Sequence, residues 1–376
     1  MQMLKFVARF VSIAVLVTLC GCGKFFSKNT CTSNCNNTGS NYIYVANVNT
    51  DNIAAFTISS TAINTISGSP YSLGVTPSAL AITPSNSFLY AASGGGGAIF
   101  GYSIGSGGAL SIINNGSAVL TGASPTALAI DTTGKWLIFV DPTPRAYVYS
   151  INTDGTLTSS GNVPLTAAAG TSPNYLAFTP ADNFLYVSMG SVGIGILNFN
   201  STTGVLTNNN QILKPKQSSD AIQGITVNSA GTYLYAAETG INSIRVLSIN
   251  STTGALTEIT GSPYTTGGTG PYGILIDSTG SYLYVANRAT NNVSAFLVSS
   301  SGALTQISGS PFTAGTNPVA LAQDNTHTYI GVVNAGGTPD LQTYTISTTT
   351  PGALVAFKSA ATGSDPTNAI AIVAAH

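Results

Sequence analysis

Charged side chains, which most acid–base and ionic chemistry requires, are scarce in this sequence. Among 376 residues there are 11 Lys and Arg, 12 Asp and Glu, and two His, so the formal net charge is −1. Three charged residues occupy related positions: Asp141 and Glu238 each end a short aromatic and apolar run, and Arg288 follows the end of another. A carboxylate can activate water as a general base, and a guanidinium can stabilise a developing oxyanion. The alternative is a solvated ion pair, worth about 0–1 kcal/mol.

The runs that carry these residues are equivalent to one another, so their ends can be compared. The last residues of the seven runs are Asn47, Ser93, Asp141, Met189, Glu238, Asn287 and Asn334. Asn has a structural reason to be there, because it tolerates turn conformations and hydrogen-bonds nearby backbone. Beside the three charged residues, the candidate ligand-binding residues are Asn47, Ser93, Asn287, Asn334 and Arg245. Arg245, after Glu238, could assist the site, although we expect it and Arg145, after Asp141, on the surface.

A repeat of 47 to 49 residues positions these run ends. Its copies begin at Pro77, Pro125, Pro173, Ile222, Pro271, Pro318 and Pro366. Each copy holds four strand-like pieces with period-2 alternation, separated by Gly, Asn and Ser turns. Four short strands in each of several such repeats are typical of a β-propeller. Because the run ends are equivalent, we expect them on one face of the disc, around the mouth of the central channel.

The two ends of the chain indicate how the ring closes. Residues 42–46 read as a second strand with no first strand before it, and residues 366–373 read as a first strand with nothing after it. Together they complete one repeat, and pairing them removes an unpaired edge. The sequence therefore predicts an all-β fold, a seven-bladed β-propeller over residues 41–376, with four antiparallel strands per blade and a closing blade shared between the termini.

Composition excludes several classes of function. The chain lacks the basic patch that nucleic-acid binding requires. It shows no cluster of metal-ligating residues, and we expect neither a metal nor another cofactor. His327 falls in a turn on the face opposite the run ends, and His376 is the last residue, so a histidine mechanism is not expected. We expect a monomer.

The first 40 residues read as a targeting segment rather than as part of the fold. Basic Lys5 and Arg9 precede an apolar run, residues 10–19, that is too short to span a bilayer. Residues 19–22, Leu-Cys-Gly-Cys, resemble the lipobox of bacterial lipoproteins. This resemblance implies a signal peptide over residues 1–22, a lipid on Cys22 that attaches the protein to the membrane, and a place in the bacterial cell envelope. The alternative is an ordinary signal peptide cleaved nearby.

Residues 23–40 are rich in Ser, Asn and Thr and predict a flexible tether. Cys31 and Cys35 lie in this tether and could form a disulfide in an oxidising compartment.

The repeats resemble the seven-bladed propeller lactonases of the 6-phosphogluconolactonase type, which are related to YVTN-repeat propellers. The resemblance rests on residues 284–288, Tyr-Val-Ala-Asn-Arg, and on a recurring Gly-Ser-Pro-aromatic phrase at 68–71, 261–264 and 309–312. It covers residues 41–376 and implies the hydrolysis of a sugar lactone, with Arg288, Glu238 and Asp141 matching functional positions of the family. The Arg and His of the family's Pro-Arg-His phrase are absent, because that phrase falls at residues 222–224, Ile-Gln-Gly. The histidines expected near Leu275 and at residues 125–127 are also absent.

Two functions remain open at this point. In a lactonase, Glu238 would be the base, Arg288 the oxyanion stabiliser, and Asp141 would orient water or a sugar hydroxyl. A phosphorylated sugar lactone would require more cations than this face carries. The alternative is a non-catalytic propeller of the cell envelope that binds a ligand or a protein partner.

Overall fold

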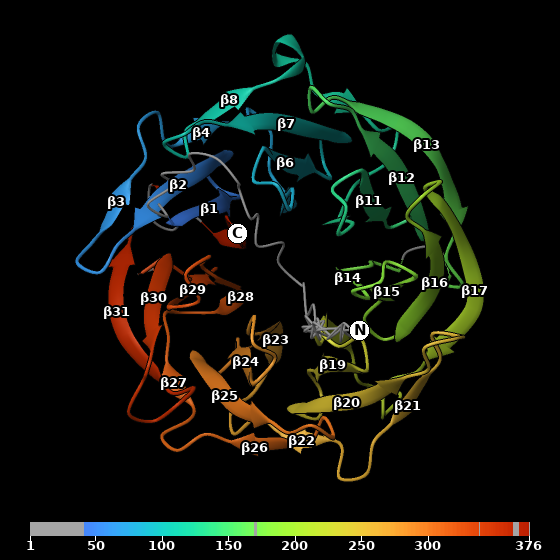
Figure 1. Cartoon of the computed structure of the whole chain (residues 1–376), viewed down its shortest axis with the longest axis vertical. Helices are drawn as coiled ribbons and strands as arrows, with labels where there is room; N and C mark the ends of the chain where they lie inside the picture. Colours follow the sequence, from blue (N-terminus) through green and yellow to red (C-terminus); the bar gives the residue numbers. More distant parts are fainter. Residues whose placement is uncertain (1–40, 169–170, 338, 364–367, 376) are drawn as a thin grey trace, which may run out of the picture.

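The computed structural model describes residues 41–168, 171–337, 339–363 and 368–375. These residues form seven antiparallel sheets arranged as blades around a central axis, so the predicted seven-bladed β-propeller is confirmed (Figure 1). Apart from one 3₁₀ turn, η1 (Asn114–Gly116), the described residues form strands, turns and loops. The predicted signal peptide, tether, Cys22, Cys31 and Cys35 lie outside the described residues, as do Pro366 and His376.

Each blade holds four main strands, numbered here from the axis outwards. The innermost strands are β5 (Ala79–Ile82), β10 (Ala127–Ile130), β14 (Tyr175–Phe178), β18 (Ile222–Val227), β23 (Pro271–Ile276), β28 (Pro318–Gln323) and β32 (Ala369–Ala374). The second strands are β6 (Phe88–Ser93), β11 (Trp136–Asp141), β15 (Phe184–Ser188), β19 (Tyr233–Glu238), β24 (Tyr282–Asn287), β29 (Tyr329–Asn334) and β1 (Asn41–Asn47). We call the blades 1 to 7 in the order of these lists.

The outer half of each blade follows the same plan. The third strands are β7 (Ala98–Ile104), β12 (Arg145–Ile151), β16 (Ile194–Asn200), β20 (Ser243–Ile249), β25 (Asn292–Val298), β30 (Leu341–Ile346) and β2 (Asn52–Ile58). The fourth strands are β8 (Leu110–Ile112), β13 (Leu157–Pro164), β17 (Val205–Leu213), β21 (Leu256–Glu258), β26 (Leu304–Gln306), β31 (Leu354–Ala360) and β3 (Ile63–Thr65). Blades 1, 4, 5 and 7 add a two-residue strand, respectively β9 (Val119–Leu120), β22 (Tyr264–Thr265), β27 (Phe312–Thr313) and β4 (Tyr71–Ser72).

The Gly-Ser-Pro-aromatic phrase builds the two-residue strands of blades 4, 5 and 7. In blade 7 the Ser69 hydroxyl accepts a hydrogen bond from the backbone N–H of Ala55 at 2.8 Å, and Ser262 and Ser310 do the same for the third strands of blades 4 and 5. The preceding glycine has a left-handed backbone, with a φ of 87° at Gly68, which other residues rarely adopt. The phrase therefore has a structural role in each blade that carries it.

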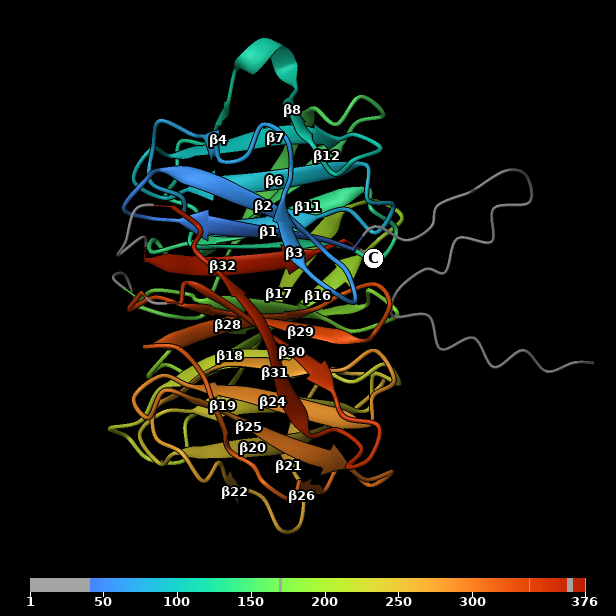
Figure 2. The same ribbon diagram turned by 90° about the vertical axis from the view of Figure 1, so that its left-hand side faces the viewer.

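Blade 7 joins the two ends of the described chain. The last strand, β32, pairs antiparallel with the first, β1, so that Tyr44 lies opposite Val373 and Ile43 opposite Ala374. Figure 2 shows the two strands side by side in opposite directions. The predicted closing blade is therefore confirmed.

One apolar cluster fills each of the seven interfaces between neighbouring blades. A buried tyrosine at an equivalent position of several second strands adds a polar contact there. The Tyr186 hydroxyl, for example, donates to the Gly254 carbonyl of the next blade at 2.9 Å, and Tyr44, Tyr90 and Tyr284 make the equivalent bond. Packing between blades thus stabilises the ring.

The strand directions give the disc two distinct faces. The second strands end on one side, which we call the ring face, together with the linkers that lead from each fourth strand to the next innermost strand. The turns between first and second strands lie on the opposite side, which we call the far face. His327 lies in such a turn and contacts Ser278 of the previous blade through its Nδ1, as its predicted position requires.

Candidate functional site

The seven run ends meet on the ring face as predicted, but they are not open to solvent. The exposed fraction of each side chain is 2% or less. In blades 4 and 7 the entering linker hydrogen-bonds to the run end. In blade 7, for example, Asn47 donates to the carbonyl of Thr362 in the entering linker, and the Thr362 hydroxyl donates back to the Asn47 side chain at 2.7 Å. The run ends therefore lie on the predicted face of the disc but are buried there.

The neutral members of the ring donate hydrogen bonds mainly within their own blades, while the side-chain oxygens of Asn287 and Asn334 have no partner among the described residues. Asn287 donates to Asn292 and Ser294, each at 2.7 Å, and Ser294 donates to the Thr266 carbonyl of the entering linker. Asn334 donates to the Pro339 carbonyl in the hairpin of its own blade at 2.8 Å. The Ser93 hydroxyl accepts the N–H of Gly96. These contacts match the structural explanation given for Asn at this place.

Asp141 also forms its hydrogen bonds within its own hairpin. Its carboxylate accepts the N–H and the hydroxyl of Thr143, the N–H of Arg145 and the hydroxyl of Tyr147. Arg145 turns away and donates to the Asn162 side chain on the outer strand β13. Asp141 therefore organises the β11–β12 hairpin in this structure.

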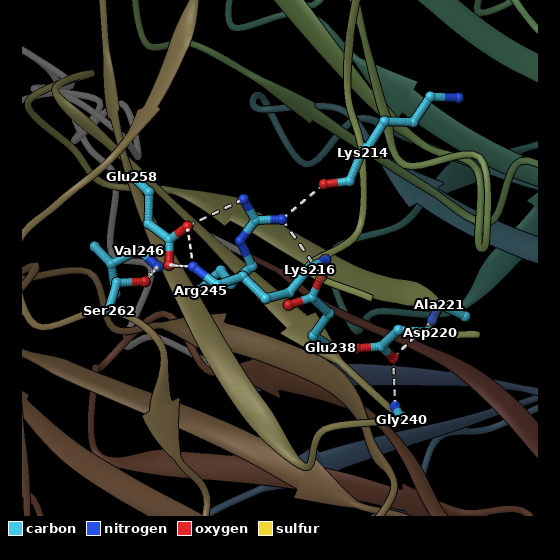
Figure 3. Close-up of polar contacts among 10 residues, drawn as sticks. All are labelled: Lys214, Lys216, Asp220, Ala221, Glu238, Gly240, Arg245, Val246, Glu258 and Ser262. Atoms are coloured by element: carbon cyan, nitrogen blue, oxygen red, sulfur yellow. Dashed lines mark hydrogen bonds and ion pairs between the residues drawn. The ribbon is translucent and has the colours of Figure 1, made fainter. Parts of the chain in front are cut away.

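Glu238 is the centre of a charged cluster in blade 4 (Figure 3). Its Oε1 accepts the backbone N–H of Lys216 in the entering linker at 2.6 Å and lies 3.3 Å from Nη1 of Arg245. The same Nη1 donates to the Lys214 carbonyl at 2.8 Å, while Nη2 lies 3.3 Å from Glu258. The cluster thus joins the linker, the second strand and the outer strand of one blade.

The expectation that Arg245 lies on the surface was wrong. Its side chain is buried, with 6% exposed. Burial of this guanidinium is tolerated because two carboxylates and a carbonyl surround it. Glu258 also pairs with Lys216, whose Nζ lies 2.9 Å away. Burial opposes the charged form of Glu258, but the hydrogen bond from Lys216 and the charge of Arg245 outweigh it, so its pKa is lowered.

The pKa of the Glu238 carboxyl is shifted in the opposite direction to that of Glu258. Burial raises its pKa above the ordinary 4.5, and the neighbouring Asp220 carboxylate adds to this, while the Lys216 N–H and Arg245 oppose it. Within the described part of the chain, its Oε2 has no hydrogen-bond partner. A buried carboxyl with a raised pKa and a free oxygen has the properties that general bases require.

Arg288 lies apart from this cluster. Its side chain is exposed, and its guanidinium carbon lies 5.3 Å from the ring centre of Tyr272, in a cation–π contact. Tyr272 in turn meets Tyr175 edge-on, with ring centres 6.1 Å apart. Ion pairs within the described ranges involve Lys216 and Arg245 but not Arg288, so Glu238 and Arg288 are not directly paired.

Sequence reasoning missed several residues of this face. Tyr272 directly follows its Pro anchor and Tyr175 is the second residue after its own, so an aromatic residue close to each anchor was a visible signal. Lys216 and Asp220 lie in a linker, and Glu258 lies in an outer strand, where the repeat pattern marks no position. The folded linker brings Lys216 and Asp220 to Glu238, and the pairing of β21 with β20 brings Glu258 to Arg245.

The far face has a small cleft among its described residues, and no charged residue lines it. The cleft has a volume of about 150 Å³, and the residues that line it include Thr179, Asn183 and Ile249. The described residues contain no group of three or more His, Cys, Asp or Glu side chains arranged to hold a metal ion. Nor does the described part of the chain contain a helix with the length and hydropathy needed to cross a membrane.

Known proteins share this architecture. The candidate 6-phosphogluconolactonases of Bacteroides fragilis and Bacteroides uniformis superpose with TM-scores of 0.74 and 0.73, at 18% and 16% identity. The alignments cover 92% and 89% of this chain, and 100% and 98% of those chains. The periplasmic gluconolactonase PpgL of Pseudomonas aeruginosa has a TM-score of 0.59 at 15% identity, over 70% of this chain and 78% of its own. These identities show a shared fold alone.

Sequence comparison adds the family. A search of curated proteins found no match. The family model described as lactonase, 7-bladed beta-propeller, matches residues 40–161 and 143–322, which is more than half of the chain. This protein therefore belongs to the lactonase family of seven-bladed β-propellers.

Proposed function

We propose that this protein hydrolyses a sugar lactone on its ring face. The observation that carries the proposal is the Glu238 carboxyl, which is buried, has a raised pKa and keeps Oε2 without a partner among the described residues. A base of this kind is poised to take a proton from water closer to neutral pH than an ordinary carboxylate. Membership of the lactonase family supports the same type of reaction.

The proposed reaction is a simple addition and elimination. Glu238 takes a proton from water as the water oxygen attacks the lactone carbonyl. The oxyanion is stabilised by a cation of the ring face, for which Arg288 is the candidate. The ring C–O bond then breaks, and the proton passes to the leaving alkoxide. The product is an open-chain hydroxy acid. Asp141, which holds its hairpin, would orient the substrate only indirectly.

A second function is favoured by one observation. Glu238 has no exposed surface, and its Oε1 is held by Lys216 and Arg245, so substrate reaches it only if the linker over blade 4 moves. Without such movement the ring face would bind a ligand or a protein partner without catalysis. We further propose that the protein is exported and attached to the cell envelope by a lipid on Cys22.

Titration of acid release separates the two functions. The purified protein is given δ-gluconolactone or 6-phosphogluconolactone at constant pH, and its rates are compared with those of Glu238→Gln, Arg288→Ala and the control Asp154→Asn on the far face. Loss of the base is expected to lower kcat by about 10²–10⁴-fold. Equal rates for all four proteins, no faster than the uncatalysed reaction, would overturn the enzymatic proposal in favour of a binding function.

A further inference from the structure

The channel mouth is the ring-face end of the axis, where the innermost strands begin at or near the residues that follow the anchors of the repeats. They are Ser78, Thr126, Asn174, Gln223, Tyr272 and Val319 in blades 1 to 6. In blades 1 and 2 these side chains are fully used, because Ser78 and Thr126 each donate to the proline carbonyl of the next blade at 2.6 Å. The hydroxyl groups of these two residues are therefore not available to donate to a ligand.

Blades 3 and 4 carry longer amide side chains at this position, and these have hydrogen-bonding groups without a partner among the described residues. The Asn174 amide donates to the Gln223 carbonyl oxygen at 3.0 Å, which fixes the two side chains against each other. The remaining amide N–H groups of Gln223 and the carbonyl oxygen of Asn174 take part in no other hydrogen bond with the described residues. A fixed donor beside a fixed acceptor is suited to neighbouring hydroxyl groups of a sugar.

Tyr175 closes the channel beside this amide pair. It starts from blade 3, and its hydroxyl donates to the Val319 carbonyl of blade 6 at 3.2 Å. The innermost strands of these blades, β14 and β28, lie on opposite sides of the axis in Figure 1. Its ring also meets Tyr272 of blade 5. The channel mouth therefore has an aromatic floor.

Arg288 belongs to the same group of residues through its contact with Tyr272. The Tyr272 ring lies under one face of its guanidinium, which holds the planar fork in place while the side chain stays exposed. Two other basic residues of this face, Arg245 and Lys216, are engaged with carboxylates. Arg145 and Lys214 lie elsewhere on the face, in the β11–β12 hairpin and in the linker that enters blade 4. Arg288 is the cation that contacts the tyrosines at the channel mouth.

We propose that Asn174, Gln223, Tyr175, Tyr272 and Arg288 form a binding site for a sugar acid that carries a single carboxylate, such as an aldonate. The carboxylate accepts two hydrogen bonds from the Arg288 fork, the sugar hydroxyls meet the Asn174–Gln223 pair, and the carbon skeleton packs on the tyrosines. The one cation in contact with this group of residues matches a carboxylate better than a phosphate dianion. The proposal deepens the proposed function, since an aldonate is the product of lactone hydrolysis.

Calorimetric titration of the purified protein tests this site without any reaction. The ligands are D-gluconate, 6-phosphogluconate and glucose, and the variants are Arg288→Gln, Arg288→Lys, Gln223→Leu and the control Arg145→Gln. We expect saturable binding of gluconate, weakened about tenfold or more by Arg288→Gln, less by Arg288→Lys, and unchanged in the control. Glu238→Gln should keep gluconate binding although it loses hydrolysis, which separates this proposal from the catalytic one.

Three results would overturn the proposal. The first is no measurable binding of gluconate at tens of millimolar. The second is gluconate binding that Arg288→Gln leaves intact, which would place the ligand elsewhere. The third is tighter binding of 6-phosphogluconate than of gluconate, which would contradict selection for a single carboxylate.

Discussion

Arg245 and Glu238 form an ion pair in the interior of blade 4, with Nη1 and Oε1 3.3 Å apart and both side chains almost completely buried. In the other blades the same ring position is neutral, except in blade 2, where Asp141 bonds to its own hairpin. Blade 4 alone among the described blades holds its entering linker through such a pair.

Removing Arg245 should destabilise the protein strongly. Arg245→Met leaves Glu238 buried without its cation, and breaking a buried pair in this way costs about 3–5 kcal/mol. The double variant Arg245→Met with Glu238→Gln should recover part of this loss, because no unpaired charge remains. Urea unfolding measures both, with Arg145→Met as the control outside the cluster. A single variant as stable as the wild type would contradict the role of the pair.

The ionisation of Glu238 should appear in the pH dependence of stability. Its pKa is raised in the folded protein, so the folded state binds the proton more tightly than the unfolded state. This contribution to stability is fully present below the ordinary pKa of 4.5 and is lost as the pH rises through the raised value. The free energy of unfolding of the wild type should therefore fall relative to Glu238→Gln over that window. A difference between the two proteins that is independent of pH, or that grows with pH, would refute the shift.

Two tyrosines at equivalent places should respond differently to loss of the hydroxyl. Tyr186 donates to the Gly254 carbonyl, so Tyr186→Phe removes a buried hydrogen bond and should cost about 1 kcal/mol. The Tyr235 hydroxyl is buried and has no partner among the described residues, so Tyr235→Phe should be neutral or stabilising. Thermal unfolding of the two variants compares them directly, and equal losses of stability would contradict the assignment.

The lipid on Cys22 remains a prediction that a labelling experiment can test. Cells that express the full chain are fed an alkyne fatty acid, and the label on the protein is detected after coupling to a dye. The wild type should be labelled, and Cys22→Ser should not. Cys31→Ser serves as the control and should keep the label. Labelling that survives Cys22→Ser would refute an anchor at this residue.

The fold could be predicted because the repeat is read directly from the sequence. Pro271 and Pro318, for example, begin innermost strands as the anchors indicated, and the unpaired strand patterns at the two ends predicted blade 7. The surroundings of the candidate site could not be predicted in the same way. Alignment of repeats shows which residues are equivalent, but it does not show that the linkers into blades 4 and 7 hydrogen-bond to the run ends there.

Contacts between distant parts of the chain set the rest of the site. Arg245 is buried because residues of a linker and of an outer strand surround it, although none of them occupies a recurring position. Tyr175 reaches Val319, which is 144 residues away, across the channel. Neither relationship is visible in a pattern with a period of 48 residues, so the floor of the channel mouth appeared only in the structure.

The start of β1 has a consequence for how an anchored molecule would be oriented. Asn41 lies on the far face, where its side chain donates to Thr326 in a turn of blade 6. The chain therefore enters the propeller from the side opposite Glu238 and Arg288. If a lipid on Cys22 holds the protein, the chain that leads to the anchor leaves the disc on the far-face side, so it leaves the ring face uncovered at its point of attachment.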